Sequence, residues 1–181
     1  SKSLLVKLSS LSSSLFRFKD SIMSDKELLI PYMRLPRSEW PAVYEQLEEA
    51  AVEATRRSYA PYSHFHVGAA ALLEDGQIVL GCNQENASFS PTLCAERTAL
   101  YAIGAHHPGA VVERMMIVAE TEGKRVEAIS PCGVCRQVMM ETVKRQGKPF
   151  EVILCGTDDA IVISDCRLLL PFAFDGLDIP S

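Results

Sequence analysis

The sequence has no long hydrophobic run and no excess of positive charge. It contains no uninterrupted stretch of about 18 apolar residues, the minimum for a membrane-spanning helix. Its 18 lysines and arginines are outnumbered by 23 aspartates and glutamates, which gives a net charge of −5. Proteins that bind nucleic acid usually carry basic surfaces that neutralise phosphates. We therefore expect no membrane and no nucleic acid among its partners.

The composition also lacks the bias of disordered, collagen-like or coiled-coil chains, since 48% of the residues are hydrophobic and 23% are charged. The 181 residues suit a single domain with a sizeable core and without internal repeats. Residues 1–23 are rich in Ser and Leu, and no acidic residue precedes Asp20. This pattern is typical of organellar targeting, but a flexible tail, or an artefact upstream of a start at Met23, is the favoured interpretation. We expect residues 1–37 to form a flexible N-terminal extension, residues 38–181 to form one domain, and the location to be cytoplasmic.

Hydrophobic spacing and turn signals predict an alternation of helices and strands. Ser38 as a cap and Pro41 in a first turn begin a helix that ends near Tyr59. Asp75-Gly76 between two apolar runs predicts a hairpin of antiparallel strands. The full set comprises helices at 38–59, 94–105 and 132–146, strands at 65–73, 78–81, 112–119, 150–155 and 161–163, and a C-terminal segment at 168–174. This order predicts an α/β protein in which helices cover the faces of a sheet.

Three of the six cysteines lie at the predicted starts of two helices. Cys94 begins one helix, and Cys132 and Cys135 share the first turn of another. Residues three apart lie on one helix face, and the positive end of a helix favours the thiolate form that binds metal. Zinc is the natural candidate, because thiolates are among its preferred ligands. Metal chemistry in a reducing compartment explains Cys-x-x-Cys better than a secreted disulfide framework does.

No fourth protein ligand is evident, which favours an open coordination position for water. His64 and His66 are best explained as ordinary histidines on or before a strand. His106 and His107 lie at the far end of the helix that Cys94 begins. The other cysteines are expected to be small buried side chains; they are Cys82, Cys155 and Cys166.

Two charged residues follow Cys94 within the same predicted turn. Glu96 is placed to take a proton from the water on the metal and to return it elsewhere. The alternative is a carboxylate that merely stabilises the helix N-terminus. Three thiolates outweigh the charge of Zn²⁺, so a cation such as Arg97 would restore the ability of the ion to acidify water. The alternative for Arg97 is an ordinary surface arginine.

The pair Cys94-Ala95-Glu96 and Pro131-Cys132-Gly133-Val134-Cys135, in this order, resembles the signature of zinc-dependent nucleobase deaminases. Over about residues 38–174 the chain closely resembles the cytidine deaminases, in particular the small homotetrameric kind, and the segments 59–70 and 81–89 support the match. The resemblance implies a three-layer α/β/α fold around a central five-stranded mixed sheet, and a homotetramer with active sites near the subunit interfaces. It also implies one Zn²⁺ per chain on the three cysteines, with Glu96 as the proton shuttle.

The same resemblance implies a set of contacts with a nucleoside. An aromatic ring packs against the pyrimidine, and two polar side chains bind a ribose hydroxyl. Backbone groups meet the base edge, an arginine donates to a ligating thiolate, and a C-terminal aromatic reaches a site across the tetramer. In that order, these residues are Phe65, Asn83 and Glu85, Ala95 and Ser130, Arg97, and Phe174. From the residues alone, Phe65 is better explained as an ordinary core residue of a strand, and Asn83 and Glu85 as residues that shape a turn.

The implied reaction is hydrolytic deamination of free cytidine and 2′-deoxycytidine, with release of ammonia, as in pyrimidine salvage. A deaminase of a related small aminonucleoside would share the metal site and differ in the nucleoside contacts. A polynucleotide deaminase would need a cationic channel, which the acidic composition disfavours. A structural zinc module without activity would need a fourth protein ligand.

Overall fold

A computed structural model of the protein describes residues 27–176. Most of the expected N-terminal extension, including all of residues 1–23, lies outside the described residues. The chain divides into two units, residues 1–30 and 31–181. The described part of the first unit, residues 27–30, contains no helix or strand. Within residues 27–176, no helix is long and apolar enough to cross a membrane.

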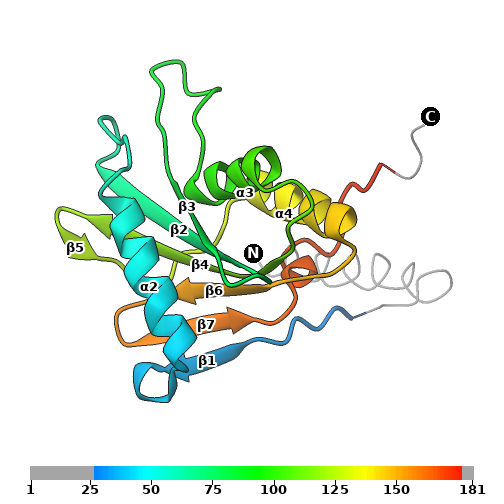
Figure 1. Ribbon diagram of the computed structural model, residues 1–181. Helices are drawn as coiled ribbons and strands as arrows, with labels where there is room; N and C mark the ends of the chain where they lie inside the picture. Colours follow the sequence, from blue (N-terminus) through cyan, green and yellow to red (C-terminus); the bar gives the residue numbers. More distant parts are fainter. Residues whose placement is uncertain (1–26, 177–181) are drawn as a thin grey trace, which may run out of the picture. The chain divides into compact units, whose positions relative to one another are not determined.

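A seven-stranded mixed sheet forms the centre of the second unit (Figure 1). Six strands run in the order β1-β7-β6-β4-β2-β3, and β5 pairs with the end of β4. Only β4 and β6 run parallel to each other. The strands are β1 (Met33–Pro36), β2 (Phe65–Leu73), β3 (Ile78–Cys82), β4 (Val112–Thr121), β5 (Lys124–Arg125), β6 (Glu151–Cys155) and β7 (Asp159–Ile163).

Two of these strands are additional to the five expected from the sequence. β1 lies inside the segment assigned to the flexible extension, where Met33 pairs with Val162 of β7 and Pro36 pairs with Asp159. Its four residues are mostly exposed, and the alternation Met33-Arg34-Leu35 ends at a proline after three residues, which is too short to signal a strand. β5 has only two residues, too few for any periodic pattern. The expected number of strands was therefore wrong, and the sheet begins ahead of the expected boundary at residue 38.

Helices cover both faces of the sheet, which confirms the three-layer α/β/α class (Figure 1). The helix α2 (Ala42–Thr55) packs on one face, and α3 (Ala95–His106) and α4 (Gly133–Gln146) pack on the other. In β2, odd-numbered residues from 67 to 73 face α3 and α4, whereas Ala70 and Leu72 face α2. Because both faces of this strand are buried, its sequence is a continuous apolar run.

The helix α2 is shorter than the sequence suggests. It begins at Ala42, with Pro41 as its N-cap, and ends at Thr55 instead of near residue 59. Trp40 keeps an extended backbone, with ψ of 134°. The residue before a proline disfavours the helical conformation, which is why the helix cannot begin at Ser38.

Two glycines allow helices to lie directly on the sheet. A Cβ atom on Gly68 would lie 1.9 Å from the carbonyl oxygen of Ala51 in α2. A Cβ atom on Gly81 would lie 2.2 Å from the carbonyl oxygen of Ala95 and 2.4 Å from the backbone nitrogen of Ala99. Neither position has room for a side chain, because these gaps are shorter than any non-bonded contact in a close-packed interior. Gly81 therefore sets how closely the first turn of α3 rests on β3.

We expect Gly81→Ala to lower the free energy of unfolding by about 1–3 kcal/mol, since the new methyl group overlaps helix backbone that cannot move independently. Gly104→Ala in α3 is the matched control. There the nearest atom to a new Cβ is the Arg145 guanidinium at 3.2 Å, the end of a flexible side chain. Urea unfolding followed by circular dichroism measures both variants. Equal stability of the two variants would contradict the packing argument.

Candidate active site

Three sulfur atoms from two helices meet at one point. The Sγ atoms of Cys94 and Cys132 are 3.7 Å apart, and those of Cys132 and Cys135 are 3.5 Å apart. All three lie within 4.8 Å of one another, and we call this group the cysteine cluster. Sulfurs bound tetrahedrally to one Zn²⁺ at about 2.3 Å lie about 3.8 Å apart, so the cluster fits one zinc ion per chain. Across residues 27–176, no further His, Cys, Asp or Glu joins the group.

Both helices begin at a cysteine of the cluster, as the sequence predicts. Cys94 is the N-cap of α3 and Cys132 is the N-cap of α4, and both have extended backbones. Neither side chain forms a capping hydrogen bond with its own helix, so the sulfur atoms stay free to bind metal. The first N–H groups of two helices therefore surround the cluster, and their partial positive charge stabilises thiolates.

Hydrogen bonds within the cluster place negative charge on Cys94. A hydrogen bond from Cys135, with a smaller contribution from Arg97, lowers the pKa of Cys94 to about 5. The pKa of Cys135 is raised, mainly because its thiol donates to Cys94. Arg97 Nη2 lies 3.7 Å from the Cys94 sulfur and donates to the Thr92 carbonyl at 3.0 Å. Arg97 is thus fixed against the cluster, and Thr92, which the sequence analysis did not single out, holds it there.

Glu96 is buried, with 4% of its surface exposed. Burial is the main cause that raises its pKa, and the negative charge of Cys94 adds to this effect. A carboxyl group with a raised pKa exchanges protons nearer to neutral pH than an ordinary glutamate does. Glu96 therefore has the properties of a group that both accepts and donates a proton.

The cluster is accessible from one side. Cys135 is buried and Cys94 is half-buried, but Cys132 is exposed. Ala95, between Cys94 and Glu96, has no exposed surface, so its methyl group belongs to the core. Solvent therefore reaches the cluster at the exposed start of α4.

The asparagine expected to bind ribose also anchors the sheet. The Asn83 side-chain amide accepts from the backbone N–H of Val67 and donates to the carbonyl of Phe65, both at 2.8 Å. The next residue, Gln84, forms a β-bridge with Leu93, which immediately precedes Cys94. The structure therefore brings Phe65 and Asn83 together and ties this segment to the chain beside a cluster ligand.

Glu85 is held in one orientation by the loop before β2. Its carboxylate accepts from the backbone N–H of Tyr62 at 2.9 Å, from that of Ser63 at 3.3 Å, and from the Ser63 hydroxyl. These hydrogen bonds, led by that of the Ser63 hydroxyl, lower the pKa of Glu85. Ser63 lies within the segment 59–70, yet nothing in its sequence context identified this contact.

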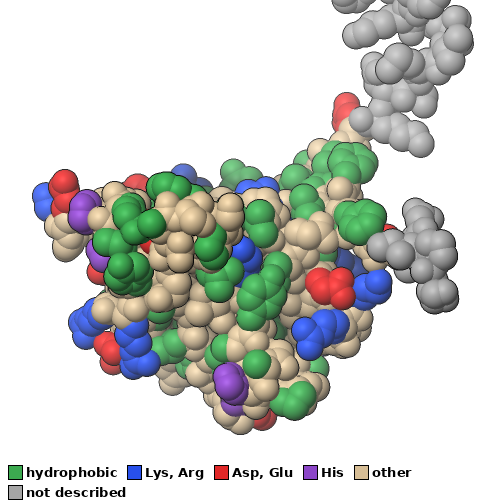
Figure 2. Space-filling model, turned by 90° about the horizontal axis from the view of Figure 1, so that it is seen from above, with side chains coloured by type: hydrophobic (Ala, Val, Ile, Leu, Met, Phe, Trp, Pro, Cys, Tyr) green, Lys and Arg blue, Asp and Glu red, His purple; other side chains and the backbone are tan. Residues whose placement is uncertain are grey.

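Phe174 belongs to the segment that follows the short 3₁₀ helix Cys166–Leu169. Its side chain is 67% exposed, and that of Phe172 is 92% exposed. Figure 2 shows hydrophobic side chains spread across one face of the molecule, with charged side chains mainly toward its edges. The ring of Phe174 is therefore accessible to solvent.

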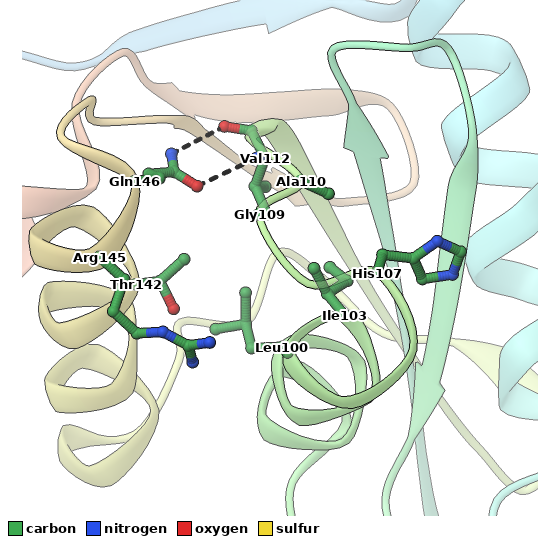
Figure 3. Close-up of a pocket in the computed structure, with 10 residues that line it drawn as sticks. Leu100, Ile103, His107, Gly109, Ala110, Val112, Thr142, Arg145 and Gln146 are labelled. Atoms are coloured by element: carbon green, nitrogen blue, oxygen red, sulfur yellow. Dashed lines mark hydrogen bonds between the residues drawn. The ribbon is translucent and has the colours of Figure 1, made fainter.

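A separate cavity of about 100 Å³ lies between the C-terminal halves of α3 and α4 (Figure 3). Leu100 and Ile103 form part of its lining, and Gln146 closes one side by hydrogen bonds to both backbone groups of Val112 at 3.0 Å. It lies toward the opposite end of both helices from the cysteine cluster. It contains none of the site residues that the sequence predicts.

Comparisons with known proteins agree with this geometry. The family model of the cytidine and deoxycytidylate deaminase zinc-binding region matches residues 41–146. A cytidine deaminase from Halalkalibacterium halodurans is 40% identical over 135 residues, which cover 75% of this chain and 96% of the relative. A probable cytidine deaminase from Dictyostelium discoideum is 37% identical over 138 residues, which cover 75% of this chain and 88% of the relative.

A solved structure leads to the same class. The crystal structure of cytidine deaminase from Burkholderia pseudomallei matches with 41% identity and a TM-score of 0.60, over 72% of this chain and 98% of that one. An α/β/α unit with a cysteine zinc site at two helix starts defines a zinc-binding deaminase. The chain belongs to the cytidine and deoxycytidylate deaminase family.

We expect wild-type protein to retain one zinc per chain after dialysis against a weak chelator, and Cys132→Ala to retain less than half as much, because one of three thiolates is lost. Cys82→Ala is the matched control, since the Cys82 thiol donates to the Arg57 carbonyl and is not part of the cluster. Elemental analysis gives the metal content. Full zinc retention by Cys132→Ala, or zinc loss from Cys82→Ala, would contradict the assigned ligand set.

Proposed function

We propose that this protein catalyses the zinc-dependent hydrolytic deamination of cytidine and 2′-deoxycytidine, to give uridine or 2′-deoxyuridine and ammonia. The observation that carries the proposal is a three-sulfur zinc site, open on one side, with a buried carboxyl group two residues after one of its ligands. A closed structural site would need a fourth protein ligand. Membership of the deaminase family supports the same reaction.

The chemistry is divided among the residues at the two helix starts. Zinc on Cys94, Cys132 and Cys135 would lower the pKa of water and so supply a nucleophile at neutral pH. Glu96 takes one proton from the water that attacks C4 and passes it to N3 of the pyrimidine. It then takes the remaining proton of the new C4 hydroxyl and delivers it to the amino group, so that the C4–N bond breaks, ammonia leaves and the C4 carbonyl forms. The raised pKa of Glu96 suits both accepting and donating a proton. Arg97 donates to Cys94 and withdraws charge from the thiolates, which preserves the acidity of the metal.

The remaining site residues bind the nucleoside. Phe65 packs against the pyrimidine, and the backbone around Ala95 and Ser130 meets the base edge. Asn83 and Glu85 bind the ribose hydroxyl. Their hydrogen bonds to the loop and to β2 support this role, because they fix both side chains before the ligand arrives. The amide of Asn83 retains one N–H that its β2 contacts do not use.

The assembly proposed is a homotetramer in which Phe174 completes a neighbouring active site. Its exposed ring, next to the even more exposed Phe172, supports this placement. We also propose that the protein acts in pyrimidine salvage and is located in the cytoplasm. The catalytic domain then runs from β1 through the C-terminal segment, preceded by the N-terminal extension.

The direct test is an absorbance assay of purified protein with cytidine, 2′-deoxycytidine and single-stranded DNA in parallel, with light scattering for the mass. We expect both nucleosides to be consumed, the DNA to be unchanged, and the mass to be four times the 19.9 kDa of the chain. Zinc-loaded protein that leaves both nucleosides intact would overturn the proposed reaction. A monomeric mass with full activity would overturn the shared site.

We expect Glu96→Gln to lower kcat for cytidine by at least about a hundredfold, because the amide is isosteric but cannot carry the proton. Zinc content and melting temperature should match those of the wild type. Glu141→Gln, at an exposed position on α4, is the matched control and should keep full activity. Substantial deamination by a zinc-loaded Glu96→Gln variant would remove Glu96 from the proton transfers.

A further inference from the structure

Arg136 follows Cys135 in the first turn of α4, and the chemistry described above does not use it. Its guanidinium donates three hydrogen bonds to acceptors outside the helix. Nε donates to the carbonyl of Pro131 at 2.8 Å, Nη2 to the hydroxyl of Ser130 at 2.9 Å, and Nη1 to the carbonyl of Leu169 at 3.0 Å. A planar fork with fixed donor directions is suited to such a set, whereas the single ammonium of lysine is not.

The helix itself does not favour an arginine at position 136, because a cation in the first turn is repelled by the positive end of the helix dipole. The first turn of α4 contains no acidic residue that would offset this charge. Arg136 also forms no hydrogen bond to a cluster sulfur, in contrast to Arg97. Arg136 therefore does not stabilise the thiolates directly, and its role is to bind the three acceptors.

The first two acceptors belong to the loop that leads into Cys132. In the described part of the chain, no backbone-to-backbone hydrogen bond holds residues 127–131. Side chains hold this loop instead. Glu127 accepts from the Thr157 hydroxyl at 3.0 Å at one end, and Arg136 binds Ser130 and Pro131 at the other. Ala128 and Ile129 pack against the core, and the hydrogen bonds of the loop portion nearest the zinc ligands come from one guanidinium.

The third acceptor connects this loop to the C-terminal segment. Leu169 is the last residue of the 3₁₀ helix, and the segment beyond it leads to Phe174. Gln137, next to Arg136, donates to the Phe174 carbonyl at 2.7 Å. Adjacent side chains on α4 thus hold both ends of residues 169–174, one turn from the metal ligands.

We propose that Arg136 is a positioning residue for the nucleoside: it fixes the Ser130–Pro131 loop and the start of the C-terminal segment relative to Cys132 and Cys135. The inference rests on the proposed function, in which the backbone at Ser130 meets the base edge. Loss of Arg136 leaves the cysteines and Glu96 in place but lets the binding surface for the base move. Because the loop touches the base in the ground state and in the transition state alike, the effect falls on KM more than on kcat.

The kinetic test uses Arg136→Gln and Arg136→Lys, with Arg145→Gln on the same helix as the matched control. We expect both Arg136 variants to keep one zinc per chain and to raise the KM for cytidine by about tenfold or more, with a smaller change in kcat. The Arg145 variant should leave both constants unchanged. A normal KM in Arg136→Lys would show that charge alone suffices, and loss of zinc from either variant would show a role in the metal site; each result overturns the proposal.

Amide hydrogen exchange provides a readout that does not depend on cytidine turnover. The amides of Leu168 and Leu170 are hydrogen-bonded in the 3₁₀ helix that Arg136 holds through the Leu169 carbonyl. We expect these amides to exchange about tenfold faster in both Arg136 variants, with the core of α4 unchanged and the Arg145 control like the wild type. Unchanged exchange at these amides would overturn the positioning role even in an active enzyme. A wild-type protein without cytidine turnover would contradict the proposed function alone, because the exchange experiment would still test the contact.

Discussion

Two helices must begin at the same point in space for three sulfur atoms to lie within 4.8 Å of one another, and the rest of the site depends on this convergence. The fold achieves it because α4 connects the parallel strands β4 and β6 on the face that α3 also covers. Gly81 lets α3 rest directly on β3, so the first turn after Cys94 lies at a fixed depth. The sheet and the helices packed on it thus set the position of the metal site, and the cysteines supply its ligands.

The electrostatics of the site follow from the same convergence. Hydrogen bonds from Cys135 and Arg97 favour a thiolate on Cys94, while burial favours the protonated form of Glu96 two residues away. Groups with opposite preferences for charge therefore sit within one turn, which is the arrangement that proton transfer at neutral pH requires. Side chains that bind no metal, such as Asn83 and Arg136, hold the neighbouring loops in place around this centre.

Much of this centre could be predicted from local sequence. Cys94 and Cys132 were recognisable as helix starts, and the apolar run of β2 and the Asp75-Gly76 hairpin predicted the two strands at one edge of the sheet. β1 escaped prediction because its four residues are too few for a periodic pattern, and it is a strand only through its pairing with β7. The contacts of Ser63 with Glu85 and of Arg136 with Leu169 join residues far apart in the chain. Residue spacing and local propensity do not predict such contacts, because they form only in the tertiary structure.

The central claim is that one zinc ion on the cysteine cluster of each chain makes the protein a cytidine deaminase. Titration of zinc into metal-free protein, with the rate of cytidine loss recorded at each addition, tests it most directly. We expect no activity without metal, a linear rise in rate with added zinc, and a plateau at one equivalent per chain. Activity in the metal-free protein, or a fully loaded cluster with no cytidine turnover, would contradict it.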